Sequence, residues 1–165
     1  MPQHVISEQT LQRIQRLRLI DDAFMCACFQ EHPECAQAVL RIVMDIPQLS
    51  VQDVRTQREF ANLHGRAIRT DITAVDAHGH LYDVEIQRPG GRHLERRAGY
   101  YLAMLRAGSL QKNQDYGALP DAYIIFICER DPFGRKLPIY RFAQRMEADG
   151  LALGDGGHII FVTGW

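Results

Sequence analysis

Residues 69–88 read RTDITAVDAHGHLYDVEIQR, and this stretch decides the fold. Polar and apolar residues alternate on both sides of Gly79, which predicts two β-strands joined by a tight turn. A three-residue loop at 77–79, with Gly79 in the left-handed conformation that such loops require, sets the pairing of the two strands. The sequence therefore predicts an antiparallel β-hairpin.

The predicted pairing places Asp71 directly across from Glu85. Opposite residues point to the same face of a hairpin with Cβ atoms about 5 Å apart, so both carboxylates can bind one divalent ion. Gln87, Thr73 and Asp83 share this face. The other face carries only apolar and aromatic residues: Ile72, Ala74, Tyr82, Val84 and Ile86. The hairpin is therefore predicted to present a core on one side and a metal site on the other.

Two alternatives stay open for this hairpin. Acidic side chains on an outer face are also typical of a half-exposed antiparallel hairpin that carries no site. A two-residue turn at His78 and Gly79 would shift the register and put Asp71 and Glu85 on opposite faces. Spacing alone does not choose between these arrangements.

The segments around the hairpin alternate between helical and strand patterns. In chain order they predict a helix at about 8–19, two helices within 21–45 divided at Pro33, a helix at 94–108, a buried central strand at 122–128 and weaker strands at 139–142 and 159–162. Helices on both sides of mixed strands indicate an α/β fold with a mixed sheet.

The composition excludes several classes of protein. The chain has 165 residues, is 46% hydrophobic and has a formal net charge of -1, which indicates one globular domain and excludes a protein that coats nucleic acid through bulk positive charge. Its four cysteines lack the paired spacing of a zinc site. The N-terminus lacks the pattern of a signal peptide and no apolar run is long enough to span a bilayer, so a cytoplasmic protein without a membrane partner is expected.

Four segments together resemble a known family, the PD-(D/E)XK nuclease family transposases, also called recombination-promoting nucleases. The segments are DDAFMCACF at 21–29, GRAIRTDITAVDAHGHLYDVEIQR at 65–88, RHLERRAGYYLAML at 92–105 and DYGALPDAYIIFIC at 115–128. The resemblance covers about 21–163 and implies a restriction-endonuclease-like core, in which a mixed β-sheet flanked by helices carries a metal-dependent phosphodiesterase site.

The resemblance also implies site residues. Asp71 matches the first metal-binding acid of the family and Glu85 the second, while Gln87 occupies the position held by lysine in the wider superfamily. The backbone carbonyl of Ile86 is a further candidate ligand by the same analogy. The implied cofactor is Mg²⁺, with Mn²⁺ as a substitute, because hard oxygen ligands hold such ions while leaving waters in place.

Other residues near the hairpin are weaker candidates. Asp22 stands at the start of a predicted helix, where it either caps the helix or lends a further carboxylate to the site. Arg92, Arg96 and Arg97 follow the hairpin closely and are either a solvated helix face or contacts to DNA phosphates. A helix that begins near His93 is expected to turn these three charges outward together.

We therefore expect a single nuclease-like domain over 1–165, with N-terminal helices at about 7–45, a catalytic core at about 54–165 and the C-terminal region of the family absent. The expected function is Mg²⁺-dependent endonuclease cleavage of DNA, of the transposase-associated, recombination-promoting type. The alternative is a non-catalytic DNA-binding or assembly module with the same fold. A two-carboxylate glycosidase has only the acidic pair in its favour. DNA is the expected partner, and a homodimer stays open.

Overall fold

The computed structural model of the protein describes residues 22–62 and 65–163. Its helices are α2 (Asp22–Glu31), α3 (Pro33–Met44), α4 (Leu94–Ala107) and the short 3-10 turn η1 (Tyr116–Ala118). Its strands are β1 (Val51–Thr56), β2 (Glu59–Phe60), β3 (Ile68–Arg69), β4 (Ile72–Asp76), β5 (Leu81–Gln87), β6 (Ala122–Cys128), β7 (Ile139–Phe142) and β8 (Gly157–Thr163). Within the described ranges, no helix has the length and apolar character needed to cross a membrane.

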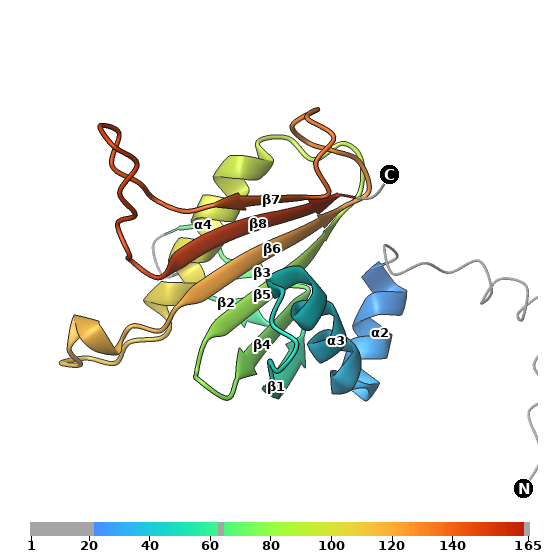
Figure 1. The fold of residues 1–165 in the computed structure, drawn as a ribbon. Helices are drawn as coiled ribbons and strands as arrows, with labels where there is room; N and C mark the ends of the chain where they lie inside the picture. Colours follow the sequence, from blue (N-terminus) through green and yellow to red (C-terminus); the bar gives the residue numbers. More distant parts are fainter. Residues whose placement is uncertain (1–21, 63–64, 164–165) are drawn as a thin grey trace, which may run out of the picture.

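Six strands form one mixed sheet in the order β1-β4-β5-β6-β8-β7. The three central strands β5, β6 and β8 run parallel, and the outer strands pair antiparallel with their neighbours. Helices α2 and α3 cover one face of this sheet and α4 covers the other (Figure 1). The result is the predicted α/β architecture, a mixed sheet between two helical layers.

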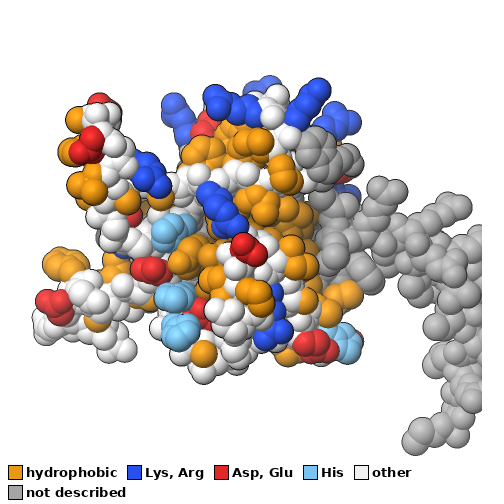
Figure 2. Space-filling model, viewed as in Figure 1, with side chains coloured by type: hydrophobic (Ala, Val, Ile, Leu, Met, Phe, Trp, Pro, Cys, Tyr) orange, Lys and Arg blue, Asp and Glu red, His pale blue; other side chains and the backbone are white. Residues whose placement is uncertain are grey.

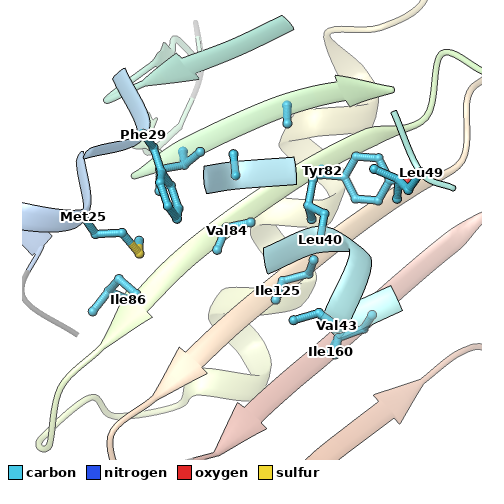
Figure 3. Packing of buried hydrophobic residues seen from close by; sticks show 13 residues of the cluster. Met25, Phe29, Leu40, Val43, Leu49, Tyr82, Val84, Ile86, Ile125 and Ile160 are labelled. Atoms are coloured by element: carbon cyan, nitrogen blue, oxygen red, sulfur yellow. The ribbon is translucent and has the colours of Figure 1, made fainter. Parts of the chain in front are cut away.

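Each face of the sheet has its own apolar cluster. On the first face, Met25 and Phe29 of α2 and Leu40 of α3 pack over Val84 and Ile125 (Figure 3). The five apolar hairpin residues that the sequence assigns to the core all belong to this cluster. The second cluster, under α4, contains Leu94, Ala98, Leu105, Ala122, Ile124, Phe126, Cys128, Tyr140 and Phe161.

Most of the predicted elements are present. The two helices divided at Pro33, the helix after the hairpin and the strands at the C-terminal end all lie where the sequence places them. The predicted helix at about 8–19 lies outside the described residues. The sequence did not predict strands β1, β2 and β3. Strand β1 is an edge strand with mostly polar residues, and β2 and β3 have only two residues each, so none of them shows a clear strand pattern.

The hairpin has the predicted register. Ile72 faces Val84 and Thr73 faces Asp83, as the three-residue loop requires. Gly79 has a φ of 83°, which confirms the left-handed conformation expected at this position. The two-residue turn is therefore wrong for this protein.

The polar face of the hairpin is not open to solvent. Thr73, Asp83 and Glu85 are all buried, and α4 packs on the same side of the sheet, mainly against β6 and β8. The interpretation as a half-exposed hairpin is therefore wrong. The apolar face is core as predicted, and of the three acids on the other face Asp83 and Glu85 are buried while Asp71 is half-buried.

Candidate active site

Asp71 and Glu85 meet where strands β4 and β5 separate. The backbone pairing of the two strands ends at Ile72, and Asp71 is the next residue. There the N–H of Asp71 donates to Oε1 of Glu85 at 2.8 Å, and the N–H of Ile86 donates to Oδ2 of Asp71 at 2.9 Å. Each carboxylate thus accepts a backbone hydrogen bond that a carbonyl accepts in regular strand pairing. These two bonds hold the side chains of Asp71 and Glu85 close together.

The two carboxylates differ in their exposure. Glu85 is buried with 4% of its surface exposed, whereas Asp71 is half-buried. Because one acid is enclosed and the other reaches the surface, the pair lies at the boundary between the core and solvent. A substrate can approach the site from the side of Asp71.

Arg97 of α4 places a cation beside Glu85. Its Nη2 atom is 3.8 Å from Oε2 of Glu85, and its guanidinium lies 4.7 Å from the ring centre of Phe126 and 5.7 Å from that of Tyr101. Arg97 lies one helical turn before Tyr101, on the side of α4 that faces the sheet. The expectation that it points outward is therefore wrong: Arg92 and Arg96 are exposed, but Arg97 turns inward to Glu85.

Gln87 lies at the end of β5, on the same face as Glu85. Its side-chain amide donates to the carbonyl of Arg88, and a Cβ added at Gly91 would come within 2.5 Å of its Nε2 atom. The absence of a side chain at Gly91 therefore leaves the space that Gln87 fills. This contact holds the amide against the connection that leads to α4.

Asp22 is the first residue of α2, and its side chain lies outside the described part of the structure. The backbone of Ile86 points toward Asp71, as its N–H bond shows. In an extended strand the N–H and C=O of one residue point to the same side, so the carbonyl of Ile86 also faces the gap between β4 and β5. The structure thus brings this carbonyl to the carboxylate pair.

Asp83 is a buried acid of this site that the sequence did not single out. It is 0% exposed, and neither of its carboxylate oxygens has a hydrogen-bonding donor. Burial raises the pKa of Asp83 well above its ordinary value, and the charges of Glu85 and Asp71 raise it further, although Arg97 acts in the opposite direction. The alternation of the strand assigned Asp83 to the correct face, but only the structure shows that it is buried.

Replacement of Asp83 by Asn is expected to stabilise the metal-free protein increasingly as the pH rises above about 4, the ordinary carboxyl pKa. Above that pH the unfolded chain loses a proton that folded Asp83 keeps, so the wild type loses stability with rising pH until folded Asp83 also ionises. Urea unfolding in EDTA across this pH range measures the difference. Asp53→Asn, on an exposed strand, is the control, and an Asp83→Asn effect that does not vary with pH would contradict the assignment.

Positive charge gathers at one end of the molecule. Lys and Arg side chains gather along the top of the view in Figure 2, the end of the molecule where the connections after β5 and β6 lie (Figure 1). Arg92, Arg96 and Arg97 line one groove of about 780 Å³ beside α4. The structure thus places the three arginines together, with Arg97 at the inner side near Glu85 and the other two exposed.

Comparison with known proteins identifies the family. A family model described as PD-(D/E)XK nuclease family transposase matches residues 37–146, which include the whole hairpin and α4. The chain belongs to this family. No curated protein and no solved structure matches the chain. Membership supports a nuclease-like function, with DNA as the substrate that a nuclease implies, and the six-stranded mixed sheet flanked by helices is consistent with the PD-(D/E)XK nuclease fold.

PD-(D/E)XK nucleases generally use divalent metals, and the donor set of this chain fits such an ion. Among the described residues, no group of three or more His, Cys, Asp or Glu side chains could hold a metal. The candidate ligands are instead the carboxylates of Asp71 and Glu85 with the carbonyl of Ile86. Mg²⁺ commonly binds one or two carboxylates and keeps several waters, so this small set of hard oxygen atoms suits it.

Proposed function

We propose that this protein is a Mg²⁺-dependent DNA endonuclease of the transposase-associated, recombination-promoting type, in which Mn²⁺ can replace Mg²⁺. The observation that carries the proposal is the pairing of Asp71 with Glu85 at the point where β4 and β5 separate, in a chain of a nuclease family. We expect it to act in the cytoplasm as one domain. A homodimer stays a prediction.

Each residue of the site has a distinct role in this proposal. When bound, the divalent ion would make a nucleophile from a water molecule and neutralise charge that develops on the phosphate. Asp71, Glu85 and the carbonyl of Ile86 hold the ion. Gln87 orients a water or a phosphate oxygen by hydrogen bonding, since an amide has both a donor and an acceptor but no charge. Arg97 provides the positive charge that lysine supplies in the wider superfamily.

Plasmid cleavage tests the proposal. Purified protein is incubated with supercoiled DNA in Mg²⁺, in Mn²⁺ and in EDTA, and calorimetry measures the affinity for both ions. We expect nicked plasmid with either metal, no nicking in EDTA, and recovery when Mg²⁺ is added in excess. DNA binding without nicking under any of these conditions would favour the non-catalytic binding module instead.

The role of Gln87 leads to a specific expectation. Gln87→Ala should reduce nicking by about tenfold or more, because one hydrogen-bonding group at the reacting phosphate is lost. Gln87→Lys should keep or raise the rate, since it restores the charge found in the superfamily. Nicking rates at saturating Mg²⁺ measure both effects, with the exposed Gln52→Ala as the control. Wild-type nicking by Gln87→Ala would remove Gln87 from the site.

The two exposed arginines and the inward one should behave differently. Arg96→Ala should weaken binding to all duplex DNA about equally and lower the slope of log K against log salt by about 0.9, as expected for one lost phosphate contact. Arg97→Ala should reduce nicking more than binding, because Arg97 lies against Glu85. Binding by fluorescence anisotropy and nicking by gel separate the two effects. Equal losses of binding and nicking in both variants would contradict this division of roles.

A further inference from the structure

The groove beside α4 has two walls. One wall is α4 with Arg96, together with Arg92 just before the helix, and the other consists of the described residues Asn62, Gly65, Arg66 and Ile68. The full lining consists of Asn62, Gly65, Arg66, Ile68, Arg92, His93, Arg96, Arg97, Tyr100 and Tyr101. Four of these residues are arginines and none is acidic, so the described lining attracts a polyanion.

Tyr100 joins the two walls. Its hydroxyl donates to the carbonyl of Arg66 and accepts a hydrogen bond of 3.0 Å from Nδ2 of Asn62. The ring belongs to α4, and both partners belong to the opposite wall. One tyrosine side chain therefore spans the distance between the walls, and the groove is narrow.

The groove leads to the carboxylate pair. Arg97 lines it and lies 3.8 Å from Glu85, and Ile68 of its lining belongs to β3, which is followed closely by Asp71. Asp71 and Glu85 are not part of the lining, so Arg97 is the residue that connects the groove with the proposed metal ligands. Arg66 lies outside α4, and no pattern in the sequence predicted that it shares a site with the arginines of that helix.

We infer that this groove binds single-stranded DNA, gripped between Arg66 on one wall and Arg92 and Arg96 on the other, and delivers the strand to Asp71 and Glu85. The inference rests on the proposed nuclease function and specifies its substrate as an unpaired strand. Sites for single-stranded nucleic acid combine a cationic groove with aromatic side chains on which bases stack. Tyr100 and Tyr101 supply that aromatic surface here.

The size of the groove favours one strand over a duplex. Its volume of about 780 Å³ lies within the range of roughly 300–1,000 Å³ that is usual for small-molecule sites. Such a space accommodates a short run of nucleotides. We expect a duplex, which is wider than a single strand, to contact the rim of a space of this size rather than its interior.

Binding of labelled oligonucleotides in EDTA tests the inference without cleavage. Fluorescence anisotropy compares a 12-nucleotide single strand with the blunt duplex of the same sequence over a series of salt concentrations. We expect the wild type to bind the single strand at least tenfold more tightly. Arg66→Ala should weaken that binding several-fold and reduce the slope of log K against log salt by about 0.7, whereas Arg66→Lys should restore most of the affinity.

The exposed Arg145, in the connection between β7 and β8, provides the matched control. Equal affinity for single strand and duplex would overturn the inference, and so would equal losses in Arg66→Ala and Arg145→Ala. Nicking of duplex plasmid with no preference for single strands would leave the nuclease proposal standing and reject the groove. A single-strand preference that depends on Arg66, without cleavage of any DNA, would support the groove and reject the nuclease proposal.

Discussion

Plasmid nicking is expected to fall by about a thousandfold when Asp71 is replaced by Asn or Glu85 by Gln. Each replacement removes a negatively charged metal ligand, and the metal stabilises the charge of the transition state by several kcal/mol, where each 1.4 kcal/mol corresponds to about a factor of ten. The amide variants are preferable to alanine because the carboxylates accept hydrogen bonds from the N–H groups of Asp71 and Ile86. An amide oxygen can still accept those bonds, so the variants should fold.

Three measurements check this expectation together. Nicking assays give the activity, calorimetry gives the affinity for Mn²⁺, and thermal unfolding in EDTA shows that the fold is retained. Glu147→Gln is the matched control, because Glu147 is exposed between β7 and β8 and lies outside the carboxylate pair. Full nicking and unchanged metal affinity in either site variant would show that the pair is not the metal centre.

Loss of the Asp76 carboxylate is expected to destabilise the protein by on the order of 3 kcal/mol, since buried donors left without an acceptor cost about 1–3 kcal/mol each. Asp76 is 4% exposed and ends strand β4 at the turn of the hairpin. Its carboxylate accepts four hydrogen bonds, from the N–H of His78, the N–H and Nδ1 of His80 and the hydroxyl of Tyr82, all between 2.9 and 3.0 Å. Asp76→Ala therefore removes the shared acceptor that holds the turn together.

Urea unfolding at pH 7 measures this loss. Tyr82→Phe is the matched variant, because it removes one of the four donors and keeps the ring, and it should cost about 1 kcal/mol. Burial acts to raise the pKa of Asp76, but the donors from Tyr82, His80 and His78 outweigh it and hold the pKa below the ordinary value. The contribution of Asp76 should thus be complete above about pH 4 and disappear as the pH falls further. A loss below that of Tyr82→Phe would contradict the assignment.

The hairpin shows how much a short sequence can specify. Alternation of side chains and a glycine suited to a left-handed turn predict a register in which Asp71 faces Glu85. The two-residue turn stayed open from the sequence, and the observed strand pairing excludes it. The alternation also identifies the apolar face of the hairpin, because side chains of a strand point alternately to its two faces.

Features that join distant segments were not predictable in the same way. The helical pattern of 94–107 predicted α4 and its buried stripe, but it did not show that α4 packs on β6 and β8, on the side of the sheet that carries the acids of the hairpin. That placement brings Arg97 next to Glu85. Edge strand β1 also escaped prediction, because its polar residues face solvent and only pairing with β4 makes the segment a strand.

Local periodicity was enough to predict the α/β fold class and a hairpin in which Asp71 can pair with Glu85, while the choice of this register over the two-residue turn came from the structure. Only the tertiary structure decided which helix covers which face, and with it the enclosure of Asp83, the inward direction of Arg97 and the meeting of Arg66 with the arginines of α4. Those outcomes depend on contacts between residues far apart in the chain. Such contacts depend on how the helices pack on the two faces of the sheet, and the periodicity within one segment does not predict that packing.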